Sequence, residues 1–378
     1  MILSPNVNVY LKTTETCNLN CQHCFTSGSQ GAKVFFSPVK VIDFFKRLKE
    51  SCPWVKTIRY NFHGGEPMLA PLSDLYSTWN GLKSVFPNSV FSIQTNLVYP
   101  MTDEKRNFFK DVFLDTGFGT SWDYDIRFGS TVKQSSEYES ARQKQIETWE
   151  NNVRLLVEDG HYLTMIVSIT KNLIQDKQPI EIVKYARDLG FKNILFERIT
   201  TYGNASVNRD IVPHNSIQDE WLHRLFNQTL EHKTYLEIGD LLLSEIAEAY
   251  VNHNHVGNRC RKCEQSLLTV NATGTIGGCP NTGPVEHWGH IEWPIAESLR
   301  SKKRLSQISC EAVDRNPVCY TCPAFEYCNS DCNKLPWDDN GTYCGAPKKV
   351  WKQMMSENRI EDYQKLILNR PTMEPHAV

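Results

Sequence analysis

The stretch TCNLNCQHCF, residues 16–25, places Cys17, Cys21 and Cys24 within eight positions of one another. The preceding residues 7–12, VNVYLK, alternate as a β-strand does, so the cysteines fall on the loop that follows a first strand. Thiolates select zinc or iron–sulfur clusters. A structural zinc site takes four ligands, whereas three cysteines can hold a [4Fe-4S] cluster with one iron left open. The stretch therefore favours an iron–sulfur centre that carries out chemistry.

A zinc site completed by His23 is the alternative interpretation of this stretch. His23 adjoins Cys24 in the sequence, so its ring reaches the same tetrahedron poorly. The remaining cysteines support metal binding more broadly. Apart from Cys52, the chain has no cysteine from residue 25 to residue 259, and the rest of the 13 cysteines lie from Cys260 to Cys344. Two separate metal regions are indicated.

The composition of the 378 residues narrows the class of protein. The hydrophobic fraction of 40% is enough for one large α/β domain and a smaller one. Lys and Arg (41) nearly balance Asp and Glu (43) and mix with them along the chain, so we expect no nucleic-acid partner. The first residues do not form a signal peptide and no run approaches the roughly 18 apolar residues of a membrane span. We expect a cytoplasmic protein without a membrane partner, in which thiols stay reduced.

Strand and helix patterns alternate six times over the first 200 residues or so. This βα pattern predicts a parallel sheet or partial barrel, in which ligands gather at the carboxyl ends of the strands. Two helical segments then form a bridge, and the region after it is rich in Gly, Pro, Asn and Cys. The expected units are a core over residues 1–212, a helical bridge over 213–256, a cysteine-rich domain over 257–346, and a single C-terminal helix with a tail over 347–378.

The spacing C-x3-C-x2-C after the first strand of a (βα)6 pattern resembles the radical S-adenosylmethionine (SAM) superfamily. The motif GGEP at residues 64–67, SIQTN at residues 92–96 and SWD at residues 121–123 end the second, third and fourth expected strands and extend the resemblance. It implies that the open iron binds SAM and that reductive cleavage yields methionine and a 5′-deoxyadenosyl radical. The SAM contacts that the resemblance implies are Gly64, Gly65, Glu66, Gln94, Asn96, Ser121, Arg142 and Ser168.

Several of these residues have a physical rationale of their own. The two glycines let main chain approach a ligand closely, and Glu66 supplies a negative charge near a cation. A guanidinium at Arg142 suits a bidentate pair with a carboxylate, and Arg127 and Arg154 are its rivals. The stretch FERITTYGNA after the sixth strand is expected to complete the cofactor wall.

The C-terminal cysteines resemble the SPASM extension of radical SAM enzymes. Four of them are spaced C-x2-C-x5-C-x3-C from residue 319 to residue 332, and GTIGGC ends at residue 279. The resemblance implies three [4Fe-4S] clusters in all, and a partial (βα)6 TIM-like barrel with a small cysteine-rich domain. Auxiliary cluster I would take Cys260, Cys263, Cys279 and Cys332, and auxiliary cluster II would take Cys319, Cys322, Cys328 and Cys344.

Two cysteines remain outside these sets. Cys52 ends a helix and is expected to be a small buried residue. Cys310 either replaces Cys260 as a ligand or is a reactive thiol near the substrate. Zinc-ribbon readings of the two C-x2-C pairs stay open, although the other cysteines of the region fit them poorly.

Within this superfamily the architecture implies a SAM-dependent oxidoreductase that modifies a ribosomally made peptide. Hydrogen abstraction would be followed by carbon–carbon or thioether crosslinking or another oxidation, and auxiliary clusters with four cysteines each would transfer electrons. The implied partners are a precursor peptide and a flavodoxin- or ferredoxin-type electron donor. Since the first strand begins near residue 7, any leader peptide is expected to bind either the core or a separate leader-recognition protein. The alternatives are a radical dehydrogenase or epimerase of a sugar or other small molecule, and a zinc-stapled binding protein without catalysis.

One departure argues against sulfatase maturation. Such enzymes carry an Asp directly after the G-x4-C cysteine, where this chain has Pro280. No single acid or base stands out here. The candidates are Asp123, Asp125, Glu197, His287 and Cys310.

Overall fold

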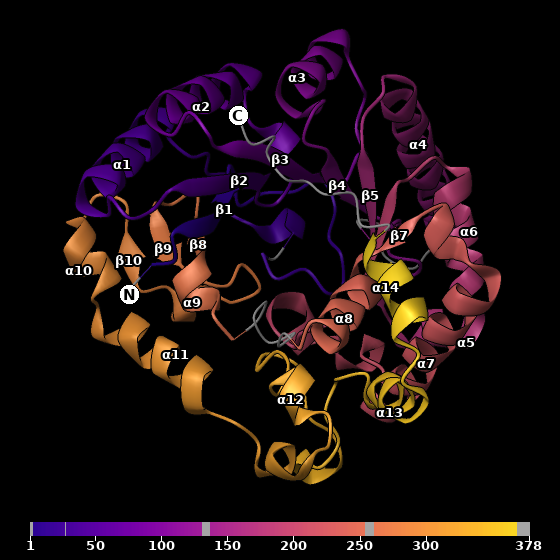
Figure 1. Cartoon of the computed structure of the whole chain (residues 1–378). Coiled ribbons are helices and arrows are strands. Elements are labelled where there is room, and N and C mark those ends of the chain that lie inside the picture. The colour runs from indigo at the N-terminus through magenta and orange to yellow at the C-terminus, as the bar shows by residue number, and fades with distance from the viewer. Residues whose placement is uncertain (1–2, 27, 131–136, 254–260, 369–378) are drawn as a thin grey trace.

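Six parallel strands form the centre of the computed structural model, which describes residues 3–26, 28–130, 137–253 and 261–368. The strands lie side by side in chain order and curve around a central space (Figure 1). They are β1 (Asn6–Lys12), β2 (Thr57–His63), β3 (Val90–Thr95), β4 (Phe118–Ser121), β5 (Leu163–Ile169) and β6 (Asn193–Arg198). The predicted partial (βα)6 barrel is confirmed.

Amphipathic helices cover the outer face of these strands (Figure 1). The first of them begins as the sequence predicts, because the hydroxyl of Ser37 accepts from the amide of Lys40 and Pro38 stands at the first helical position. The covering helices are α1 (Pro38–Ser51), α2 (Leu72–Val85), α3 (Asp103–Phe113), α4 (Tyr138–Glu158) and α6 (Pro179–Asp188). No described helix is long and apolar enough to cross a membrane.

A further short helix, α5 (Lys171–Asp176), follows β5 and was not predicted. Its six residues are too few to show a helical period. The hydroxyl of Thr170 starts it by accepting from the amide of Leu173 at 3.0 Å.

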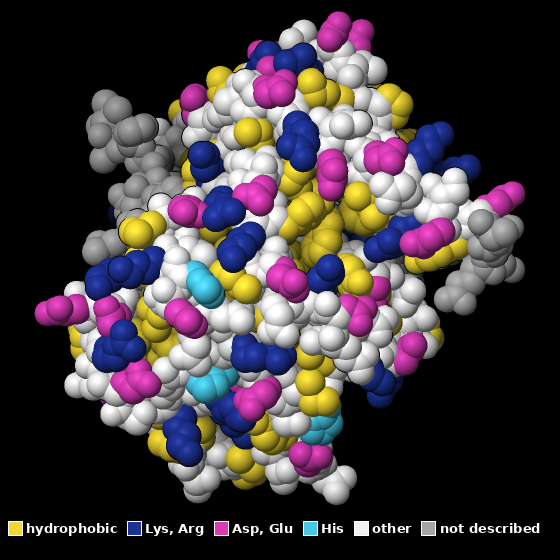
Figure 2. Space-filling model, turned by 90° about the vertical axis from the view of Figure 1, so that its right-hand side faces the viewer, with side chains coloured by type: hydrophobic (Ala, Val, Ile, Leu, Met, Phe, Trp, Pro, Cys, Tyr) yellow, Lys and Arg dark blue, Asp and Glu magenta, His cyan; other side chains and the backbone are white. Residues whose placement is uncertain are grey.

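The core lies between the sheet and these helices and is rich in aromatic rings. Tyr60 stacks on Phe91 at 4.9 Å between ring centroids, and Phe62 and Phe108 are fully buried beside them. Burial of each such side chain contributes about 1.5–3 kcal/mol. On the outer surface, cations and anions are interspersed over the face that Figure 2 shows, as the balanced composition predicts.

The sheet continues on both sides with strands from later segments. β7 (Gly239–Asp240) pairs parallel with β6, and β8 (Leu267–Val270) pairs parallel with β1. β9 (Thr275–Gly277) and β10 (Gly289–His290) add antiparallel pairs. The expected helical bridge and the cysteine-rich region thus both contribute strands to the central sheet, so the divisions at 212 and 256 remain predictions.

The bridge holds two helices, and the C-terminal segments lie along the side that the six strands leave open (Figure 1). The two bridge helices are α7 (Asn215–His232) and α8 (Leu241–Val251). The helices of the cysteine-rich region are α9 (Cys263–Ser266), α10 (Ile295–Leu299), α11 (Lys302–Val313) and α12 (Phe325–Cys328).

The single C-terminal helix that we expected is wrong. The structure has α13 (Lys348–Glu357) and α14 (Ile360–Leu368) instead, because Asn358 adopts a left-handed φ of 49° and ends the first of them. The second helix then turns back onto α8, where Tyr363 meets Tyr250 at 5.9 Å between ring centroids.

Candidate functional site

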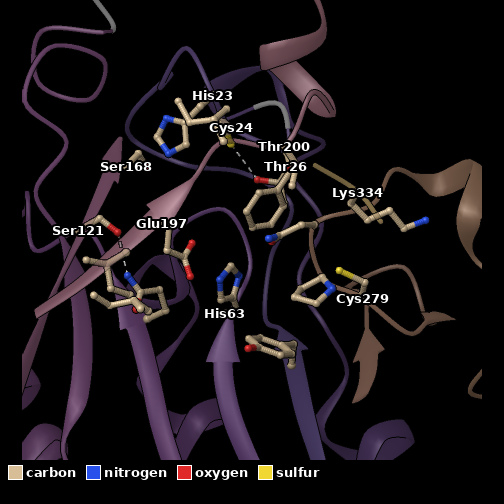
Figure 3. A pocket seen from close by; sticks show the side chains of 18 of the residues that line it. His23, Cys24, Thr26, His63, Ser121, Ser168, Glu197, Thr200, Cys279 and Lys334 are labelled. Carbon is tan, nitrogen blue, oxygen red and sulfur yellow. Dashed lines mark hydrogen bonds between the residues drawn. The ribbon is translucent and has the colours of Figure 1, made fainter. Parts of the chain in front are cut away.

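A cavity of about 620 Å³ opens where the carboxyl ends of the barrel strands meet the C-terminal region (Figure 3). Two groups of cysteines line it: Cys17, Cys21 and Cys24 from the loop after β1, and Cys263, Cys279 and Cys332 from the cysteine-rich region. Segments far apart in the sequence therefore meet at one space. Cys260, the remaining residue predicted for auxiliary cluster I, lies outside the described residues.

The loop that carries the first three cysteines is fixed by the turn after β2. The amide of Gly65 donates to the carbonyl of Thr14 at 2.9 Å, and the amide of Glu66 donates to that of Thr16 at 2.9 Å. The contact is so close that a Cβ on Gly65 would lie 1.8 Å from the oxygen of Thr16. The glycines of GGEP thus let main chain approach the cysteine loop itself.

A second clamp on the same loop comes from the turn after β6, which the sequence analysis had placed in the cofactor wall. The amide of Asn204 donates to the carbonyl of Cys24 at 2.7 Å, and its side chain donates to the carbonyl of Cys21 at 3.0 Å. Gly203 has a φ of +57° and a Cβ there would lie 2.3 Å from the oxygen of Cys24. The cysteine loop is therefore held from two strand ends at once.

The chemistry of the three thiols fits a metal-bound cluster. The sulfur of Cys17 accepts from the amide of Leu19 at 3.3 Å and from the amide side chain of Asn96 at 3.6 Å, and such donors favour thiolate. Burial nevertheless raises the pKa of Cys17 and of Cys21 to about 12. Buried thiolates at this site need a positive partner, which the iron of a cluster would supply.

Seven of the eight residues predicted to contact SAM lie around this cavity. Gln94 donates to the hydroxyl of Ser121 at 3.0 Å across the ends of β3 and β4 (Figure 3). Their roles toward a cofactor remain predictions. The seven are Gly64, Gly65, Glu66, Gln94, Asn96, Ser121 and Ser168.

The carboxylate of Glu66 is engaged inside the protein. It is 1% exposed and accepts from the amide of Asn96 and the hydroxyl of Thr95, both at 2.7 Å, and from the amide of Met68 at 3.0 Å. Glu66 therefore joins the turn after β2 to the end of β3. These internal hydrogen bonds were not predicted from the sequence, and a contact of Glu66 with SAM remains a prediction.

Arg142, the eighth residue, does not line the cavity. Its guanidinium donates to the carbonyl of Tyr124 at 3.0 Å and to Glu139 at 3.2 Å. Arg127 lines the cavity instead and pairs with the fully buried Asp123. Among the arginines weighed from the sequence, Arg127 is the one that the fold brings to the thiols.

The pair of Asp123 and Arg127 forms part of the wall behind the cysteine loop. Burial by itself would raise the pKa of Asp123, but Arg127 and His23 hold it below its usual range. Its other oxygen accepts from the amide of Ser168 at 2.8 Å, so this candidate acid or base is committed to internal contacts.

We expect Asp123→Ala to lower the free energy of unfolding by about 3–5 kcal/mol, because it leaves the guanidinium of Arg127 buried without its carboxylate. Urea denaturation of the metal-free protein measures the effect. The matched control is Asp43→Ala, which breaks the exposed pair with Arg47 and should change stability by about 0–1 kcal/mol. Equal losses in the two variants would contradict this account of the buried pair.

Of the five candidate catalytic residues, Glu197 lines the main cavity and points into it (Figure 3). Asp125 accepts from Thr170 and Asn172 and lines a separate cavity of about 350 Å³. His287 bonds to Thr275 at 3.0 Å outside the lining of the main cavity. Cys310 is exposed on α11, also outside that lining.

The sequence analysis missed His63, which ends β2 and faces the cavity (Figure 3). Its Nδ1 accepts from the amide of Gly64 at 2.8 Å, and burial, reinforced by Lys12, lowers the pKa of His63 to about 3. The ring is therefore neutral and carries its proton on Nε2. Its position as the last residue of a strand, directly before Gly64 and Gly65, is the sequence feature that could have identified it.

The four cysteines predicted for auxiliary cluster II gather away from the cavity. Burial raises the pKa of Cys328 well above its usual value, and the nearby thiols of Cys344 and Cys322 raise it further. Cys344 in turn lies within electrostatic range of Cys319. Among the described residues, no three His, Cys, Asp or Glu side chains converge closely enough to hold a single metal ion.

The loop between the two auxiliary sets is held in an unusual backbone conformation. Asn329, Ser330 and Asp331 have φ values of 48°, 68° and 49°, which non-glycine residues rarely adopt. Arg198 at the end of β6 pairs with Asp331, and Arg261 donates to the carbonyls of Asp331 and Ser330. This anchoring ties the loop that carries Cys332 to the barrel.

Fold and site together define a barrel that carries a loop of three cysteines at its mouth, next to a cysteine-rich region. No family model matches the sequence, and none of the curated proteins matches it significantly. Solved structures do match. Native anSMEcpe with bound AdoMet and the Cp18Cys peptide superposes with a TM-score of 0.72 at 15% identity, over 97% of this chain and 100% of that one.

SuiB of Streptococcus suis is a second match. Bound to S-adenosylmethionine it gives a TM-score of 0.58 at 13% identity over 86% of this chain and 73% of that one, and it has also been solved bound to its precursor peptide SuiA. At these identities the likeness shows the fold. The chain shares the fold of these two proteins, and this is the fold that the sequence resemblance implied.

Proposed function

We propose that the chain is a radical SAM enzyme with a SPASM extension that modifies a ribosomally made peptide. The observation that carries this proposal is the single cavity lined by Cys17, Cys21 and Cys24 on one side and by Cys263, Cys279 and Cys332 on the other. A cavity with this lining brings a radical-generating centre and an electron-accepting centre to the same substrate. We assign the order of events as hydrogen abstraction followed by crosslinking or another oxidation.

The residues would hold the cofactors as follows. Cys17, Cys21 and Cys24 would ligate a [4Fe-4S] cluster, which supplies the electron that cleaves SAM to methionine and a 5′-deoxyadenosyl radical. The cavity residues Gln94, Asn96, Ser121 and Ser168 would bind and orient SAM beside it. The two auxiliary clusters would use the ligand sets that the resemblance to SPASM enzymes implies.

One observation supports a peptide substrate over a small molecule. The solved structures of anSMEcpe and SuiB that this chain resembles both contain a bound peptide. A flavodoxin- or ferredoxin-type donor and a separate leader-recognition protein complete the proposal.

Anaerobic reconstitution followed by iron and sulfide analysis tests the proposal. We expect about 12 iron per chain, because three clusters of four are predicted. With SAM and dithionite the reconstituted chain should release 5′-deoxyadenosine. Zinc without sulfide would contradict the enzyme assignment. Co-expression with short peptides encoded beside its gene, followed by mass spectrometry, tests the substrate class, and a product made from a sugar instead would favour a small-molecule enzyme.

A further inference from the structure

Lys12 is a buried lysine to which no ligand has been assigned, and burial lowers the pKa of its amino group. It ends β1 and is 4% exposed. Within the described part of the chain, no hydrogen bond or ion pair engages its ammonium group. Lysines keep this group in water in almost every protein, because a buried charge without a partner is strongly destabilising. The position of Lys12 therefore calls for a negative partner.

The strand pairing places Lys12 between the two groups of cysteines. On one side its Nζ lies 5.8 Å from the ring centroid of Phe25, the residue next to Cys24. On the other side β8 pairs with β1 and β9 pairs with β8, and Cys279 follows two residues after β9. The thiols of both cysteines lie within electrostatic range of the ammonium. The amino group thus lies near a predicted ligand of each cluster.

The other titratable groups around Lys12 do not neutralise it by direct pairing. Glu15 attracts the ammonium from beyond ion-pair distance, and its Oε1 accepts from the amide of Ala272 at 3.2 Å. His63 and His287 face Lys12, and burial together with its charge lowers their pKa values to about 3 and about 4, so both rings are neutral. The largest negative charges that this pocket can receive are the clusters themselves.

We propose that Lys12 is the shared counter-charge of the radical SAM cluster and auxiliary cluster I, and that its ammonium raises the reduction potential of both. An iron–sulfur cluster ligated by thiolates carries net negative charge, and a fixed cation nearby favours its reduced form. Because Lys12 adjoins both centres, its charge acts on the two potentials together. This inference rests on the proposed function, since it requires that both clusters bind.

Lys334 provides a contrast close by. It also lies within electrostatic range of Cys279, but it pairs with Glu286 at 3.8 Å and stands over the ring of Tyr202. Its charge is therefore already balanced by protein groups. Lys12 differs in having the predicted cluster ligands themselves as its negative partners.

The test measures reduction potentials by redox titration followed by electron paramagnetic resonance. The variants are Lys12→Met, which keeps the length of the side chain without the charge, and Lys12→Arg, which keeps the charge. Lys46→Met removes an exposed lysine of α1 and is the matched control. A second series in a Cys17→Ala, Cys21→Ala, Cys24→Ala background reports the auxiliary clusters alone.

We expect Lys12→Met to lower the potential of the radical SAM cluster and of one auxiliary cluster, and Lys12→Arg and Lys46→Met to leave both near the wild-type values. Unchanged potentials in Lys12→Met with full iron content overturn the proposal. Loss of iron in both Lys12 variants also overturns it, because the residue would then serve assembly rather than potential. Failure of the proposed function is seen separately, as a wild-type chain that takes up no iron and sulfide.

Discussion

Replacing Cys17, Cys21 and Cys24 together by alanine is expected to abolish formation of 5′-deoxyadenosine from SAM, down to the background of the assay. The three thiols are the cysteines that the loop after β1 brings to the cavity, and both clamps on this loop bond to its main chain rather than to its sulfurs. The loop should therefore fold without them while losing its cluster. Iron should fall from about 12 to about 8 per chain, because the auxiliary clusters have their own ligands.

Cys52→Ala is the matched control for the loss of a thiol. Cys52 is 2% exposed in the hydrophobic core and lies away from the cavity lining. Its replacement should keep the iron content and the rate of SAM cleavage. Deoxyadenosine formation that persists in the triple variant would refute the assignment of the open cluster, and an equal loss in Cys52→Ala would show that the assay reports stability.

Local sequence patterns were sufficient to predict the six strands and their covering helices. Each strand is a short apolar run that ends at a turn. A helix such as α1 is predicted from the cap at Ser37, from Pro38 at the first helical position and from the helical spacing of its apolar residues. The alternation of strands and helices by itself predicts a parallel sheet. In such a sheet the carboxyl ends of all the strands lie at one edge. The cysteine loop was located in this way, whereas Gln94, Asn96, Ser121 and Ser168 were selected by the resemblance to radical SAM enzymes.

Contacts between distant segments could not be predicted by the same reasoning. The pairing of β8 with β1 joins residues more than 250 positions apart, and two-residue strands such as β7 have no period. The clamp by Asn204 on the cysteine loop and the burial of Lys12 depend on the same long-range packing. Arg142 was favoured over Arg127 because the sequence places both near the fourth strand and says nothing about which one faces inward.

Glu66 shows how a motif can be found from the sequence while its contacts inside the protein are not predicted. The motif GGEP suggests a ligand contact, because a glycine pair and a carboxylate often mark a binding turn. In the structure the carboxylate spans to Asn96 and Thr95 at the end of β3, and the second glycine packs against the cysteine loop. The motif thus positions the cysteine loop through contacts within the protein. A single substitution can test this role.

Gly65→Ala is expected to lower the rate of SAM cleavage by about 100-fold, a loss typical of a 1 Å displacement at a reacting centre. An added Cβ would meet the carbonyl oxygen of Thr16 at 1.8 Å and the amide nitrogen of Cys17 at 2.9 Å. Both are main-chain atoms, so the cysteine loop itself must move. Gly283→Ala is the matched control, because a Cβ there meets nothing within 4 Å.

The measurement combines iron content, rate of deoxyadenosine formation and thermal unfolding for both variants. Displacement of the loop predicts a lower rate in Gly65→Ala, with iron lost from the radical SAM cluster and kept in the auxiliary clusters, because Cys279 and Cys332 lie on segments that Gly65 does not touch. Gly283→Ala should match the wild type in all three measurements. A Gly65→Ala variant with wild-type rate and iron would show that the turn after β2 does not set the position of Cys17.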